Sequence, residues 1–385
     1  MIKKLMAYLI IIALVGSFMT GCATKSSETA AKESEEIKIG AVLPLTGDVA
    51  TFGESSKNAL ELLKEEVNSN GGVLGKKITF IYEDDENKPA SSANAAQKLI
   101  NNDNVVGLIG SVASKCSLAI GPIANAAKIP MITPTSTNPK VTTEGGEYVF
   151  RACFIDPFQG TVLAKFATED LKAKKAAVLY DVANDYTKGL AEFFKKGFEE
   201  LGGEIVAFET YNTGDTDFNA QLTNIKNTNP DVLLLPDYYN TVGLIAKQAR
   251  ALGIEAAFLG GDGWDSPDLF TVGGDAVNNG YFSNHFSPDD TSEEVVVFRK
   301  AFEAKYSKTP DALAGLAYDA GKILLAAIEK AGTTEGEKVK DALKATDMTV
   351  VSGHVYYDED RNPIKGAVII KTEDGKQKFA AKVNP

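Results

Sequence analysis

The sequence predicts an α/β protein with two doubly wound, Rossmann-like lobes, each built on a mostly parallel sheet. Short strands that are apolar throughout alternate with amphipathic helices, a pattern typical of parallel sheets covered on both faces. A weak internal repeat supports the division into two, because the order of strands and helices in residues 37–109 recurs in residues 176–235. A pair of glycines ends the first helix of each unit, at Gly71-Gly72 and Gly202-Gly203.

Each element follows from a local run of residues. In the first unit we expect strands at 37–43, 77–82 and 105–109, with helices at 53–68 and 90–101. In the second we expect strands at 176–180, 205–209 and 232–235, with helices at 187–201 and 218–227. Beyond these units, residues 291–330 are expected to be largely helical, and 353–358 and 367–371 to be strands. Doubly wound sheets bind ligands beyond the carboxyl ends of their strands. A cleft between the lobes would then be lined by the loops after Val42, Ile109, Tyr180, Leu235 and Leu259.

The first 22 residues predict where the protein works. Lys3 and Lys4 precede an apolar run from Leu5 to Phe18, which is shorter than the about 20 residues of a membrane span. This pattern is that of a secretory signal, and Gly21-Cys22 resembles a bacterial lipobox. Cys22 is therefore expected to carry lipid, with residues 23–36 as a flexible linker. We expect an extracytoplasmic protein anchored to a bacterial membrane, in a periplasm or at the cell surface.

Composition argues against several functions. The 40 basic and 52 acidic residues give a net charge of −12, which disfavours nucleic acid as a partner. The two histidines, His285 and His354, are far apart in the sequence and are expected to lie away from the cleft, so neither a metal site nor a catalytic base is predicted. No cofactor motif and no nucleophile elbow is present, and we expect no enzyme. An anchored hydrolase with Ser114 or Cys116 as nucleophile is the competing hypothesis. Cys116 and Cys153 are compatible with either a disulfide or two free thiols.

Two loops of the first lobe offer groups for an anion. Ser114 and Ser117 stand at the start of a helix, where backbone N–H groups lack partners, so they either cap the helix or bind a carboxylate. The following loop holds Thr135, Ser136 and Thr137 between prolines that fix an extended course. It could equally be an ordinary polar loop.

A glycine-rich loop of the second lobe offers groups for a cation. In Gly260-Gly-Asp-Gly-Trp264, the glycines allow a sharp turn that brings Asp262 and Trp264 to the cleft. A carboxylate beside aromatic rings suits an ammonium group. Asp262 or Asp265 could instead serve only as a turn or N-cap residue.

Taken together, these loops resemble the type I periplasmic solute-binding proteins, in particular the leucine/isoleucine/valine-binding family of ABC importers. The resemblance covers nearly all of residues 37–371. It rests on Leu45-Thr-Gly-Asp-Val-Ala-Thr-Phe-Gly53, Tyr82-Glu-Asp-Asp85, Ile129-Pro-Met-Ile-Thr-Pro134, Asp185-Tyr186, Lys247-Gln-Ala-Arg-Ala-Leu-Gly253 and Gly260-Gly-Asp-Gly263.

The resemblance implies roles for individual residues. Ser114, Thr135 and Thr137 would bind a ligand carboxylate, and Asp262 with Thr135 its ammonium group. Phe52, Tyr186, Tyr238 and Trp264 would surround the ligand side chain and close over it. Phe52 stands where the family often has tyrosine, and Asp262 is one methylene shorter than the usual glutamate.

The resemblance also implies an architecture and a function. Lobe I would comprise residues 37–155 and 286–368, and lobe II residues 156–285 and 369–385. Three hinge strands would join them near Phe154–Pro157, near His285–Pro288 and near Ile369. The expected function is capture of an amino acid, branched-chain or otherwise aliphatic, by a monomer that delivers it to an ABC permease. The alternative is a sensor, or a binder of amides, urea or aromatic acids, with the same fold.

Overall fold

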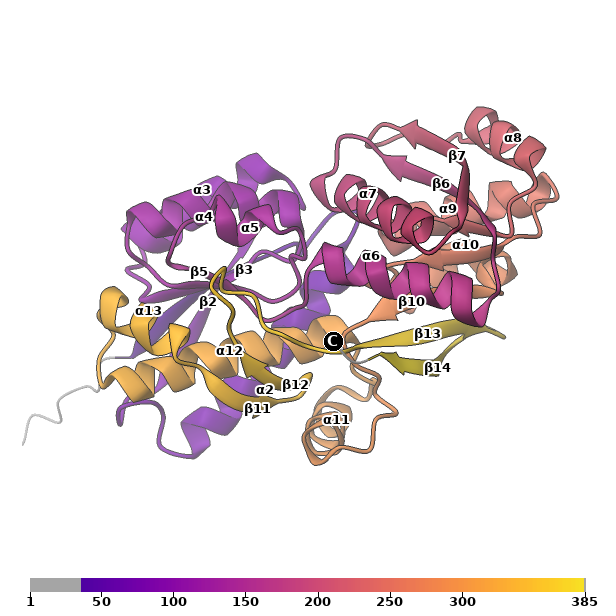
Figure 1. Cartoon of the computed structure of the whole chain (residues 1–385). Coiled ribbons are helices and arrows are strands. Elements are labelled where there is room, and N and C mark those ends of the chain that lie inside the picture. The colour runs from indigo at the N-terminus through magenta and orange to yellow at the C-terminus, as the bar shows by residue number, and fades with distance from the viewer. Residues whose placement is uncertain (1–35, 384–385) are drawn as a thin grey trace, which may run out of the picture. The chain divides into compact units, whose positions relative to one another are not determined.

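The computed structural model describes residues 36–383, and in these the chain forms two β-sheets, each packed between helices (Figure 1). The predicted signal segment 1–22 with Cys22, and the linker 23–36 apart from its last residue, lie outside the described residues. All of the described residues belong to one compact unit.

The sheet of the first lobe has five parallel strands in the order β2-β1-β3-β4-β5. These strands are β1 (Ile37–Leu43), β2 (Ile78–Asp84), β3 (Gly107–Gly110), β4 (Met131–Thr133) and β5 (Val149–Arg151). The helices that follow them are α2 (Ala50–Ser69), α3 (Pro89–Asn101), α4 (Ser114–Ala126) and α5 (Lys140–Thr143). Later parts of the chain add α11 (Glu293–Tyr306), α12 (Ala312–Ala331), α13 (Gly336–Lys344) and the hairpin β11 (Asp347–Val350) and β12 (Gly353–Tyr356).

Successive residues of these strands enter different cores, which is why the strands are apolar throughout. Leu108 packs with Leu99 of α3 on one face, whereas Ile109 belongs to the core that includes α2 and α12 on the other. Two glycines in the strands allow the helices on either face to approach the sheet closely. A Cβ at Gly40 would lie 2.9 Å from Leu99, and one at Gly107 would lie 2.8 Å from Leu324 of α12.

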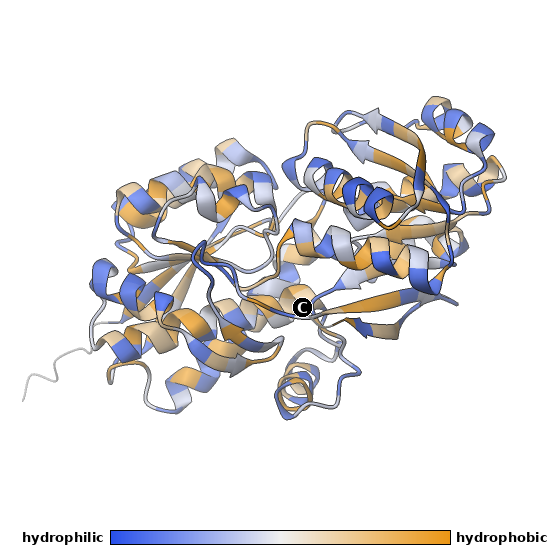
Figure 2. Ribbon diagram, in the orientation of Figure 1, coloured by the Kyte–Doolittle hydropathy of each residue, from blue (hydrophilic) through white to orange (hydrophobic). Residues whose placement is uncertain are grey.

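The sheet of the second lobe has seven strands in the order β14-β13-β10-β9-β8-β6-β7. Its parallel strands are β6 (Lys175–Asp181), β7 (Glu204–Tyr211), β8 (Val232–Leu234), β9 (Ala257–Gly260) and β10 (Gly280–Asn284). Two antiparallel strands, β13 (Ala367–Glu373) and β14 (Lys376–Val383), complete one edge. The helices are α6 (Asp156–Lys165), α7 (Asp185–Glu200), α8 (Asn219–Thr228), α9 (Tyr239–Ala251) and α10 (Asp268–Gly273), with short helical turns at Phe166–Asp170, Asp262–Trp264 and Gly274–Val277. Figure 2 shows the hydrophobic residues gathered on the strands and on the inner faces of the helices.

The chain passes between the two sheets three times, at residues 152–155, 285–292 and 357–366. The first two crossings lie at Phe154 and His285, where hinges were expected. The third lies just before Ile369, which is itself part of β13. The predicted fold of two doubly wound lobes is confirmed, and the chain joins them three times as expected, although the joining segments are irregular chain and not strands. The lobe boundaries at residues 155, 285 and 368 stay a proposal for where the lobes pivot.

The expected elements of both units are present, with bounds shifted by a few residues. The helical stretch predicted at 291–330 is two helices, because Ser307 takes a left-handed φ of 53° and Pro310 follows. Strand β14 was not predicted. Within residues 36–383, none of the helices is both long and apolar enough to cross a membrane.

Candidate functional site

A small cavity of about 20 Å³ lies between the loops at the carboxyl ends of the two sheets. The first lobe lines it with Phe52, Val112, Ser114, Thr135 and Leu313, and the second with Tyr186, Tyr238, Asp262 and Gly263. Each lobe thus supplies about half of the wall. Six of the predicted site residues meet here, namely Phe52, Ser114, Thr135, Tyr186, Tyr238 and Asp262.

The wall of the first lobe presents the N-terminus of helix α4. Ser114 is the first residue of this helix and lines the cavity, so the positive end of the helix lies at the cavity wall. No side chain caps this end of the helix. The Ser114 hydroxyl accepts a hydrogen bond from the Asn138 N–H at 3.2 Å, which fixes its position. The Thr135 hydroxyl donates to the Val112 carbonyl at 3.0 Å. Backbone amides at a helix N-terminus are suited to an anion, as is the Ser114 hydroxyl, which accepts from Asn138 and keeps its own hydrogen to donate.

The loop that carries Thr135 is held from behind by a buried arginine. Arg151, at the end of β5, donates to the carbonyls of Ser136 at 2.5 Å and Asn138 at 2.9 Å. The Ser117 hydroxyl belongs to this support, because it lies 2.7 Å from that of Ser136. Ser117 therefore fixes the loop and does not line the cavity.

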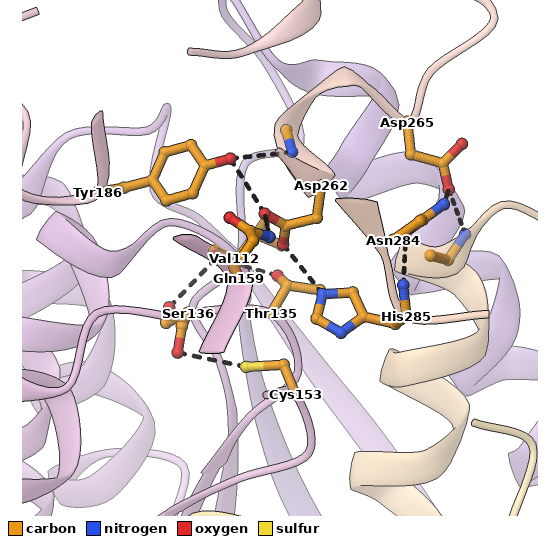
Figure 3. A network of polar contacts seen from close by, with 12 residues as sticks. Val112, Thr135, Ser136, Cys153, Gln159, Tyr186, Asp262, Asp265, Asn284 and His285 are labelled. Carbon is orange, nitrogen blue, oxygen red and sulfur yellow. Dashed lines mark hydrogen bonds and ion pairs between the residues drawn. The ribbon is translucent and has the colours of Figure 1, made fainter. Parts of the chain in front are cut away.

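The wall of the second lobe centres on the carboxylate of Asp262, which is 8% exposed (Figure 3). Gln159 Nε2 and the Tyr186 hydroxyl both donate to Oδ1, at 2.9 and 3.0 Å. His285 Nε2 lies 3.0 Å from Oδ2. The Gly263 N–H in turn donates to the Tyr186 hydroxyl at 3.2 Å. Three donors from three elements therefore fix a single carboxylate at the cavity.

The contact with His285 corrects one expectation. The sequence placed both histidines away from the cleft, but His285 follows β10 directly and reaches the carboxylate of Asp262. Gln159 was not predicted either. It lies inside α6, where nothing in the local pattern marks it. For His285 a usable signal was present, because it stands at the carboxyl end of an apolar strand.

Aromatic rings from both lobes close the cavity around Asp262. The rings of Tyr186 and Tyr238 stack at 5.5 Å, and Phe52 of the first lobe meets Tyr238 edge-on at 5.9 Å. Val112 and Leu313 complete an apolar wall. Asp262 is the one charged residue among those lining this cavity.

Two predicted site residues do not line the cavity. Trp264 is fully buried, donates from Nε1 to the Leu235 carbonyl at 3.0 Å and packs near Phe282. Its indole therefore belongs to the core beneath the cavity. Thr137 is also buried, and its carbonyl accepts the Asp156 N–H at 3.0 Å.

Asp156 itself is a buried acid behind the cavity. It has no exposed surface, and neither of its carboxyl oxygens has a partner of ordinary hydrogen-bonding geometry among the described residues. Burial raises the pKa of Asp156 to about 8, and the charge of Asp262 adds to this effect. Asp156 is therefore largely a neutral acid at pH 7.

The described residues give less support for a cysteine nucleophile or a metal site. Cys116 and Cys153 are separate, buried free thiols, and burial raises the pKa of each to about 12. Such thiols are poor nucleophiles. Within the described part of the chain, no group of three or more His, Cys, Asp or Glu side chains could hold a metal ion.

Comparisons with known proteins identify the family and agree with the fold. Residues 36–377 match the family model described as periplasmic binding protein. A leucine-, isoleucine-, valine-, threonine- and alanine-binding protein of Pseudomonas aeruginosa is 31% identical over 328 residues, which cover 85% of this chain and 87% of the relative.

Two solved structures are similar over almost their whole length. A leucine binding protein, LivK, of Thermotoga maritima superposes with a TM-score of 0.87 at 40% identity, covering 91% of this chain and 99% of the other. The branched-chain amino acid transporter substrate binding protein LivJ of Streptococcus pneumoniae, solved with isoleucine, gives 0.86 at 34% identity, covering 91% and 100%.

Proposed function

Since this chain belongs to the periplasmic binding protein family, in its Leu/Ile/Val-binding branch, we propose that it captures an aliphatic amino acid between its lobes. It then delivers this amino acid to an ABC permease. In this proposal the protein acts outside the cytoplasm as a monomer, anchored through lipid on Cys22, and it performs no catalysis.

The observation that carries the proposal is the polarity of the cavity. The N-terminus of α4 with Ser114 and Thr135 offers donors on one wall, and Asp262 offers a carboxylate on the other. An α-amino acid carries an anion and a cation on adjacent carbons, so it matches this pair of walls. We assign the ligand carboxylate to the Ser114 hydroxyl and the backbone N–H of Thr135, and the ammonium group to Asp262. The Thr135 hydroxyl, which donates to the Val112 carbonyl and so can only accept from a ligand, is a further partner of the ammonium group. We assign Thr137 an indirect role, in which its backbone carbonyl holds the loop by accepting the Asp156 N–H.

The remaining wall supports an aliphatic side chain. Phe52, Val112 and Leu313 are apolar, and Tyr186 and Tyr238 present their ring faces to one another beside them. A charged ligand side chain would lose its hydration here with no partner to replace it. Trp264 acts on the ligand only indirectly, as support for the Asp262 loop.

A thermal-shift and calorimetric screen of the amino acids tests the proposal. Leucine, isoleucine or valine is expected to raise the melting temperature, since a ligand that binds only the folded state stabilises it. Amides, urea and benzoate serve as competing ligand classes. A rise with benzoate and none with any amino acid would overturn the proposal.

The substitution Asp262→Asn tests the ammonium site directly. We expect it to weaken amino-acid binding by about 2–5 kcal/mol, because it leaves a buried ammonium without its charged partner. Asp275→Asn is the matched control, since Asp275 is an exposed aspartate of the same lobe. Unchanged affinity of Asp262→Asn in calorimetry would remove Asp262 from the site.

A further inference from the structure

His285 is a buried histidine whose role the proposed ligand contacts do not explain. It does not line the cavity, and its side chain is 1% exposed, yet its Nε2 lies 3.0 Å from Asp262 Oδ2. A histidine that merely filled the core would not need this contact, since phenylalanine fills such space without a polar atom to satisfy.

The hydrogen-bonding pattern defines the state of the ring. A carboxylate can only accept, so Nε2 must carry the proton of the bond to Asp262. Nδ1 is buried without a partner among the described residues, which fits an unprotonated nitrogen better than a second N–H. Burial also lowers the pKa of His285, which favours the neutral ring. A neutral donor orients Asp262 without cancelling its negative charge.

His285 also joins the carboxylate to the hinge. It is the first residue of the crossing at 285–292, and its ring stacks on Phe154 of the crossing at 152–155, with centroids 3.8 Å apart. The backbone N–H of His285 donates to Asn284 Oδ1, and Asn284 Nδ2 donates to Asp265 at 2.9 Å. Figure 3 shows this continuous path from Asp262 through His285 to Asp265. The imidazole of His285, which itself belongs to the crossing at 285–292, thus contacts both the Asp262 carboxylate and the crossing at 152–155.

We propose that His285 is a positioning residue for ammonium recognition, which holds the Asp262 carboxylate toward the cavity and couples it to the crossings on which the lobes pivot. This inference rests on the proposed function, because it takes the ammonium group of an amino acid as the partner of Asp262. The inference predicts a selective effect. Loss of the Nε2 donor should weaken the binding of ligands that carry an ammonium group and leave the affinity for ligands without one nearly unchanged.

The test compares two ligands and two variants. His285→Phe keeps a flat ring to stack on Phe154 but removes the donor, whereas His285→Gln restores an N–H near the position of Nε2. We expect His285→Phe to weaken leucine binding about 10- to 100-fold, the usual effect of losing a hydrogen bond to a charged group. Binding of 4-methylpentanoate, which is leucine without its ammonium group, should change less than about threefold, as expected for a contact that this ligand never used. His285→Gln should recover most of the leucine affinity.

His354→Phe is the matched control. His354 is the other histidine of the chain, lies on β12 and is half exposed, so this variant should bind both ligands as the wild type does. Equal weakening of leucine and 4-methylpentanoate by His285→Phe would show a purely structural role and overturn the inference. Unchanged leucine affinity would overturn it too. A wild-type protein that binds no amino acid would overturn the proposed function itself.

A measurement on the wild-type protein covers the case in which His285→Phe does not fold. Nitrogen-15 NMR of the two imidazoles, assigned with His354→Phe, should show His285 as the neutral tautomer with its proton on Nε2. Adding leucine should shift that Nε2 signal. A proton on Nδ1, or an Nε2 signal unaffected by leucine, would contradict the proposal.

Discussion

In the proposed function, a single carboxylate at the cavity, that of Asp262, selects the ligand. The Asp262 carboxylate accepts hydrogen bonds from Gln159, Tyr186 and His285, all of them neutral donors. A carboxylate has about four acceptor positions, so one remains for a ligand. The three donors fix the direction of that position. The carboxylate therefore needs little reorientation when an ammonium group approaches from the cavity, so little free energy is lost on binding.

Removal of one donor should therefore cost affinity without unfolding the protein. We expect Tyr186→Phe to weaken amino-acid binding by about 1.5–3 kcal/mol, since its hydroxyl donates to the charged Oδ1 and also accepts from the Gly263 N–H. Tyr180→Phe, at another buried tyrosine of the same lobe, is the control. Titration calorimetry measures both variants. Equal affinity of Tyr186→Phe and the wild type would mean that this hydroxyl does not orient Asp262.

The residues of the site differ in how far sequence could predict them. Asp262, Tyr186 and Tyr238 follow apolar strands, so their loops must lie at the edge where ligands bind. Gln159 could not be found in this way, because it lies within a helix and reaches Asp262 only through the packing of α6 against the second sheet. Trp264 was misplaced for a related reason: its loop is at the cleft, but its ring turns inward to Leu235.

At the scale of elements, the N-terminus of α12 joins the two lobes. Asp311 caps the helix by accepting the Ala314 N–H at 2.8 Å. Asp265, from the loop beyond β9 in the other lobe, accepts the Ala312 N–H at 2.7 Å. Two carboxylates thus share one positive helix end. Burial, with the charge of Asp265, raises the pKa of Asp311 to about 7.

This arrangement predicts opposite effects for two substitutions. Asp311→Asn keeps a capping oxygen and removes a charge beside Asp265, so we expect stability equal to or above that of the wild type at pH 8. Asp311→Ala loses the cap and should lower the free energy of unfolding by about 1 kcal/mol. At pH 5, where Asp311 is protonated, the advantage of Asp311→Asn should vanish. Urea denaturation at both pH values measures this. If Asp311→Asn and Asp311→Ala are equally destabilised at pH 8, the charge is not the cause.

The sequence predicted best those elements whose pattern of apolar and polar residues matches their pattern of buried and exposed residues. Strand β1 is apolar and almost fully buried, so its pattern suffices. Strand β14 (Lys376–Val383) lies at the sheet edge with exposed and half-buried residues, and its apolar run is only three residues long, Phe379 to Ala381, between lysines. Its position depends on pairing with β13, which is a tertiary contact.

At the scale of the whole molecule, hydrogen bonds join the two lobes beside the cavity, and the proposed closure would depend on such contacts. The Tyr239 hydroxyl donates to the Asp48 carbonyl at 3.2 Å, and Asn138 Nδ2 donates to the Asp185 carbonyl at 2.8 Å. A ligand shifts such an equilibrium only through a difference in its affinity for the open and closed states. In the proposed function, an amino acid bound by Ser114 in one lobe and Asp262 in the other would have this difference, because its two ends would contact different lobes.

Buried acids near the crossings make the stability of the whole molecule depend on pH. Asp156 follows the crossing at 152–155 and keeps its proton in the folded state up to a pH of about 8, whereas an aspartate in the unfolded chain loses it near pH 4. Between these values the folded state binds the extra proton, so the free energy of unfolding should fall as the pH rises from about 4 to about 8.

Asp156→Asn should remove the share of this slope that Asp156 contributes. The amide cannot ionise, so the variant should gain stability relative to the wild type as the pH rises, with the largest gain near pH 8.5 and little at pH 5. Urea unfolding at several pH values measures the slope, and Asp275→Asn, an exposed aspartate, should leave it unchanged. A slope equal to that of the wild type in Asp156→Asn would mean that Asp156 is ionised in the folded protein. Asp156 and Asp262 would then carry two negative charges together instead of the one that the burial of Asp156 implies, and an ammonium ligand would be attracted by both carboxylates.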